Sequence, residues 1–85
     1  MTTMQAALQE IRQKAFASIE NEGSPALSDA EAYDLARAAL LKPVGNKNEG
    51  WALERILLLA ADSLFFDEEF PESDVLRIAE EALLP

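Results

Sequence analysis

Three short clusters containing glycine or proline divide this chain into four segments. They are NEGSP at residues 21–25, KPVG at 42–45 and FPE at 70–72, and such residues end helices or form turns. Between these breaks the apolar residues recur at spacings of three and four, which is the periodicity of an amphipathic helix and not that of a strand. The sequence therefore predicts an all-α fold of about four helices with short connections.

The helices are expected over residues 4–21, from the cap at Ser28 to the residues before Pro43, over residues 49–66, and from Ser73 or one turn earlier at Pro71 toward Pro85. Polar residues that can accept a hydrogen bond from a free backbone N–H precede each segment. The expected caps are Thr2, Ser28, either Asn46 or Asn48, and Ser73 or the turn before it at Pro71. Each connection is short enough to favour antiparallel neighbours, although the unequal helix lengths leave a regular up-and-down bundle less certain than the helix count.

Each segment has one predicted apolar face. The third segment is apolar around most of its circumference, so it needs neighbours on more than one side, and we expect it to be the central helix. The second segment has a face of small residues that permits close approach. The predicted buried faces are Met4, Leu8, Ile11, Ala15 and Ile19; Ala32, Leu35, Ala36, Ala39 and Leu40; Leu53, Ile56, Leu57, Ala60 and Leu64; and Val75, Leu76, Ala79, Ala82 and Leu83.

The length of 85 residues predicts a single domain spanning residues 1–85 with a small core. No cysteine is present, so no disulfide can supplement that core. The apolar inventory is nevertheless large, and Trp51, Leu58, Leu59 and Phe66 exceed what a monomer of this size readily buries. Trp51 is expected in the core or at its rim, with a binding platform as the alternative. A homodimer formed through the third and fourth helices is one way to cover the surplus.

The net charge of −9 is concentrated near the C-terminus. Residues 51–85 carry nine acids and two bases, a net charge of −7. Such a surface repels the phosphates of nucleic acids and anionic membranes, so we expect no direct binding to either. It attracts a basic protein surface instead. The longest uncharged apolar run, residues 56–61, spans about 9 Å as a helix and is too short to cross a membrane. With no secretory signal apparent at the start of the sequence, a cytoplasmic location is expected.

The sequence offers little material for catalysis. It has neither histidine nor cysteine, which removes the usual zinc, haem and iron–sulfur ligands and the nucleophilic triads. Asp62, near the end of the third segment, is a weak acid–base candidate that is better explained as solvated or paired with Arg55. The acids of residues 67–74 lack the spacing and glycine of a calcium loop. We therefore expect no enzyme activity, no cofactor and no metal.

The segment DSLFFDEEFPESD at residues 62–74 places three phenylalanines among six carboxylates. One interpretation buries Phe65 and Phe70 as a plug at the end of the bundle, with Phe66 at its edge. The other leaves one or two of these rings exposed within an acidic rim, which is the anatomy of a protein-docking patch. The predicted partner-binding residues are Phe65, Phe66, Asp67, Glu68, Glu69, Phe70 and Glu72.

The function predicted from these features is a non-enzymatic interaction module. It would be an acidic helical adaptor or inhibitor that docks on a basic or apolar surface of another protein. An acidic inhibitor can also imitate the phosphates of a nucleic acid, but charge alone supports that version. The alternative is a structural or regulatory subunit of a larger assembly, joined through an apolar helix face, whose acidity serves only solubility.

Overall fold

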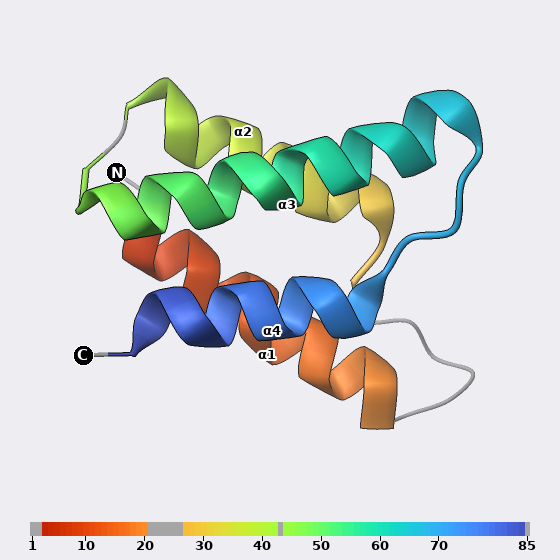
Figure 1. Ribbon diagram of the computed structural model, residues 1–85, viewed down its shortest axis with the longest axis horizontal. Helices are drawn as coiled ribbons and strands as arrows, with labels where there is room; N and C mark the ends of the chain where they lie inside the picture. The colour runs from red at the N-terminus through yellow and green to blue at the C-terminus, as the bar shows by residue number, and fades with distance from the viewer. Residues whose placement is uncertain (1–2, 21–26, 43, 85) are drawn as a thin grey trace.

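The computed structural model describes residues 3–20, 27–42 and 44–84, and these residues form four helices and no strand. The helices are α1 (Met4–Glu20), α2 (Asp29–Leu41), α3 (Lys47–Phe66) and α4 (Glu72–Leu83). Figure 1 shows them as an up-and-down arrangement in which α1 and α3 run in one direction and α2 and α4 in the other. The all-α prediction is confirmed, and successive helices run in opposite directions (Figure 1).

Helix starts are fixed by local hydrogen bonds. The hydroxyl of Thr3 accepts from the N–H of Ala6 at 3.0 Å, whereas the cap expected at Thr2 lies outside the described residues. The hydroxyl of Ser28 accepts from the N–H of Glu31 at 3.1 Å. Such side chains satisfy backbone donors that have no partner within the helix. The second cap is confirmed, and the first lies one residue beyond the predicted position.

The start of α3 is a complete capping box. Asn46 accepts from the N–H of Glu49 at 2.8 Å, and the buried Glu49 carboxylate accepts from the N–H of Asn46 at 2.9 Å. The helix therefore begins at Lys47 after the predicted cap at Asn46, two residues earlier than the alternative cap at Asn48 would place it. At the last helix Pro71 is the cap residue, and Ser73 lies inside α4 without a capping role.

The helices pack as two pairs, α2 with α3 and α1 with α4, drawn one above the other in Figure 1. Helix α3 contacts all three other helices, as expected for a central helix, and so does α1. The described parts of α2 and α4 do not touch. Thus α1 and α3 contact each other across the diagonal of the bundle, and each also packs against α2 and α4.

The core is built around small side chains. Among the residues that the structure describes, half of the 16 buried hydrophobic ones are alanines, and α2 buries only alanines, which confirms its predicted small face. Ile19 and Leu64 were predicted on buried faces but are exposed near helix ends. The largest fully buried side chains are Leu8, Ile11, Leu27, Leu53, Ile56 and Val75.

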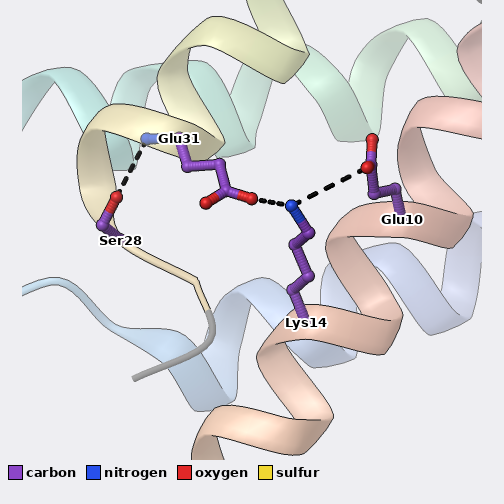
Figure 2. Close-up of polar contacts among 4 residues, drawn as sticks. All are labelled: Glu10, Lys14, Ser28 and Glu31. Atoms are coloured by element: carbon purple, nitrogen blue, oxygen red, sulfur yellow. Dashed lines mark hydrogen bonds and ion pairs between the residues drawn. The ribbon is translucent and has the colours of Figure 1, made fainter. Parts of the chain in front are cut away.

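Polar contacts tie the helices together around this core. Lys14 of α1 lies between Glu10 of its own helix, 3.7 Å away, and Glu31 of α2 (Figure 2). The Glu31 carboxylate therefore pairs with Lys14 of α1. Only the backbone N–H of Glu31 takes part in the cap at Ser28. The ion pairs are partly exposed, so each contributes modestly. Their main effect is to fix the orientation of α1 against α2.

Two further contacts use serine hydroxyl groups that are largely buried. Ser63 of α3 donates to Asp29 at the start of α2 at 2.6 Å, and Ser18 near the end of α1 donates to Glu72 in the first turn of α4. Both acceptors lie in the first turn of a helix, where the positive end of the helix dipole stabilises a carboxylate. These contacts join α2 to α3 and α1 to α4, the two closely packed pairs.

No helix in the described part of the chain is long and apolar enough to cross a membrane.

Candidate docking surface

The predicted aromatic and acidic patch is only partly assembled. Phe65 and Phe66, at the C-terminal end of α3, are 67% and 72% exposed. The three acids at residues 67–69 follow them and are exposed as well. Phe70 instead packs against the core, and Glu72 is half-buried through its bond from Ser18. Five of the seven predicted residues therefore form one exposed segment, while Phe70 and Glu72 serve the fold.

The interpretation in which Phe65 and Phe70 together plug the bundle is wrong for Phe65. The ring of Phe65 packs against Tyr33 of α2, with centroids 5.8 Å apart and ring planes at 86°. This geometry suits the charge distribution of aromatic rings and holds Phe65 in place while leaving most of it exposed. Tyr33 itself is half-buried.

Sequence reasoning missed that this exposed surface continues along the whole of α3. Trp51 is 73% exposed and Leu58 is 65% exposed, so the expectation that Trp51 lies in the core or at its rim is wrong. Residues 51, 58 and 65 are spaced by seven, and two turns of helix bring such residues to nearly the same side. The seven-residue spacing was the signal that identifies this side of the helix.

We call Trp51, Leu58, Phe65 and the adjoining Phe66 the outward stripe. It extends along about 21 Å of the helix, given a rise of 1.5 Å per residue. It lies opposite the side on which Leu53, Ile56 and Ala60 are fully buried. A contiguous apolar surface of this kind on a small domain marks an interaction site more often than isolated exposed side chains do.

A shallow groove of about 180 Å³ runs beside the stripe, between α3 and α4. Its walls come from the N-terminal half of α3 and the C-terminal half of α4, and they are mainly apolar with charged residues at the edge. The lining residues are Asn48, Trp51, Ala52, Arg55, Ile78, Glu81 and Ala82. An open groove of this size can receive one side chain of a docked protein.

Charged residues flank the stripe. Arg55 and Asp62 are both exposed, and neither is in an ion pair among the described residues. The expected pairing of Asp62 with Arg55 within the chain is therefore not made, and Asp62 is solvated. Among the described residues, acids do not converge in a group of three or more that could hold a metal ion. The site consists of an apolar stripe, a groove and unpaired charges.

The end of α3 turns the chain sharply away from this surface. Asp67 adopts a left-handed backbone conformation with φ of 58°, which aspartate tolerates better than most residues. The turn directs residues 68–71 toward α4 and leaves Phe65 and Phe66 as the last helical residues. The acids therefore border the stripe at one end only.

Comparison of the chain with protein-family models, with curated proteins and with solved structures finds no match.

Proposed function

We propose that this protein is a non-enzymatic interaction module that binds another protein chain through the outward stripe of α3. The observation that carries the proposal is the exposure of three aromatic residues and one leucine, each between 65% and 73% exposed, on the side of α3 away from the core. Large aromatics at the centre of a patch commonly supply most of the free energy of binding.

The composition of the borders supports a partner with a particular chemistry. The C-terminal border of the stripe carries three consecutive acids at residues 67–69, so a basic group on the partner is favoured there. The middle of the stripe is apolar and narrow, which suits the apolar face of a helix. Charge at the rim mainly raises the association rate and selects partners, whereas the apolar centre supplies affinity.

The stripe also supports the second candidate function, a subunit of a larger assembly. The specific observation is that Trp51 lies about 21 Å along α3 from Phe65, near which the acids at residues 67–69 follow. Most of the stripe is therefore remote from the acidic border. Salt separates the two. Docking steered by the acids weakens steeply between low and high salt, while association along the apolar stripe changes little.

The test is a quantified pull-down with the tagged chain and proteins of its native host. A Leu58→Asp/Phe66→Asp variant is compared with Leu41→Asp/Leu84→Asp, which places the same charges at two leucines that are exposed elsewhere. Circular dichroism verifies that both variants stay helical. The proposal expects bound partners, further copies of the chain included, to be lost from the first variant alone. Retention of every partner by the folded stripe variant overturns it.

A further inference from the structure

The symmetry of the outward stripe and the charges beside it indicate the binding partner of this surface. We propose that this partner is a second copy of this chain, packed with α3 against α3 in antiparallel orientation and with the two-fold axis passing beside Leu58. This inference rests on the proposed function and names the partner of the same surface. It is supported by four separate features, namely the spacing of the apolar residues, the flanking charges, the position of the groove and the area available.

The spacing gives the register. Leu58 lies midway along the stripe, seven residues after Trp51 and seven before Phe65. In an antiparallel pair centred on Leu58, residues at equal distances before and after it face each other. Each Trp51 then meets Phe65 of the second copy, and the two Leu58 side chains meet at the axis. A two-fold interface needs such a self-complementary surface, and aromatic pairs at both ends add stabilising contacts.

The flanking charges favour the antiparallel orientation. Arg55 and Asp62 lie three residues before and four residues after Leu58, and they project within about 20° of each other around the helix axis. Within one chain they are about 10 Å apart along the axis, too far for an ion pair. The antiparallel pair places each Arg55 beside Asp62 of the second copy, twice by symmetry. In a parallel pair the two-fold axis runs along the helices, so the α4 sides lie at opposite edges and Arg55 does not meet Asp62 of the second copy.

The groove accounts for Phe66. This residue follows Phe65 by about 100° around α3, on the side of the stripe that adjoins α4, where Arg55 and Ala52 line the groove. A two-fold axis perpendicular to the helices keeps the α4 sides of both copies together. Phe66 of one copy therefore lies over the groove of the other. A space of about 180 Å³ accommodates a phenyl ring, since a cavity of about 150 Å³ holds benzene.

The helix ends complete the match. Lys47 begins α3, and the three acids at residues 67–69 follow its end. The antiparallel pair brings these oppositely charged ends together, along with the opposite ends of the helix dipoles. The exposed fractions of the four stripe residues correspond to about 500 Å² per copy, or about 1,000 Å² for the pair. That area is near the lower limit for a specific interface, so we expect a dissociation constant in the micromolar range.

Sedimentation velocity of the full chain, from about 1 µM to about 500 µM, tests for the dimer. The wild-type chain should convert from monomer to dimer over this range. Leu58→Asp places two carboxylates at the axis and should raise the dissociation constant by about 100-fold. Leu41→Asp, the matched control at an exposed leucine on α2, should leave it unchanged, and circular dichroism monitors the helix content of both.

A charge exchange tests the orientation. Arg55→Asp alone and Asp62→Arg alone each place like charges together and should weaken the dimer by about tenfold, whereas the double variant should restore it to within about threefold of wild type. Because the chain has no cysteine, single cysteines also report geometry. Leu58→Cys should be joined by a short bis-maleimide crosslinker, and Asn48→Cys should not, because its two copies lie about 30 Å apart.

The outcomes separate this inference from the function it rests on. A chain that stays monomeric at about 500 µM, or a dimer unaffected by Leu58→Asp, overturns the second copy as the occupant. Partners lost from the stripe variant in the pull-down would still support the interaction module in that event. Failure of the double charge variant to recover, or efficient crosslinking through Asn48→Cys, overturns the antiparallel arrangement.

Discussion

Both sides of α3 carry large apolar residues, but the two sides differ in what surrounds them. The inner side carries Leu53 and Ile56, which are fully buried against the other three helices. The outer side carries Trp51 and Leu58, which face solvent. By transfer free energy the outer residues would gain at least as much from burial as the inner ones. One side of α3 therefore packs within its own chain, and the other side remains available to a second chain.

The largest expected effect compares the same substitution on the two sides. Leu53→Ala removes a fully buried side chain and should lower the free energy of unfolding by about 2–5 kcal/mol, because a cavity remains. Leu58→Ala should change it by less than about 0.5 kcal/mol in the monomer. Urea denaturation at low micromolar concentration measures both. Equal losses from the two variants would show that the outer side also contributes to the monomer fold.

A second comparison tests how strongly the loop before α3 constrains the start of the helix. Gly45 precedes the capping box with φ of 151°, a conformation that side chains rarely adopt. A Cβ atom there would collide with the Glu49 carboxylate and lie 3.1 Å from Cε of Met4. Gly45→Ala should therefore cost about 1–3 kcal/mol of stability.

Gly50, one turn into α3, provides the control for that prediction. A Cβ atom at Gly50 would meet only Met4, at ordinary contact distances of 3.6 and 3.9 Å. Gly50→Ala should stabilise the protein by about 0.5–1 kcal/mol, because alanine is the better helix former. Thermal unfolding followed by circular dichroism compares the two variants. If both alanines stabilise the chain, the loop before α3 is not a constraint on the helix.

The smallest expected effect concerns two adjacent polar residues of α3, one exposed and one buried. Ser63 is buried and donates to Asp29 of α2, so Ser63→Ala should cost about 1 kcal/mol. Asp62 is exposed on the outer side, and Asp62→Asn should change the stability of the monomer by less than about 0.5 kcal/mol. Urea titrations of both variants measure the difference. A larger loss from Asp62→Asn would contradict the assignment of the two sides.

Much of the candidate site was visible in the sequence, but its extent was not. The mixture of Phe65, Phe66 and the following acids indicated an exposed patch, and five of the predicted residues do lie on one exposed segment. Phe70 lies in the connection to α4 and packs against the core, and Glu72 begins α4 and accepts a hydrogen bond from Ser18. Both residues therefore contribute to the fold and not to the exposed patch. Trp51 and Leu58 were identified as surplus apolar residues that a homodimer through the third and fourth helices could cover, but not as members of one stripe along α3.

The sequence by itself determined where the helices run, because glycine and proline, the caps and the apolar period act through bonds and contacts within a few residues. Periodicity also determined which residues share a side of a helix. Only the tertiary structure decided which apolar side of α3 is covered, since that depends on helices distant in the chain and on the small alanine face of α2. Three helices cannot surround a fourth of this length completely, and so one apolar side stays open.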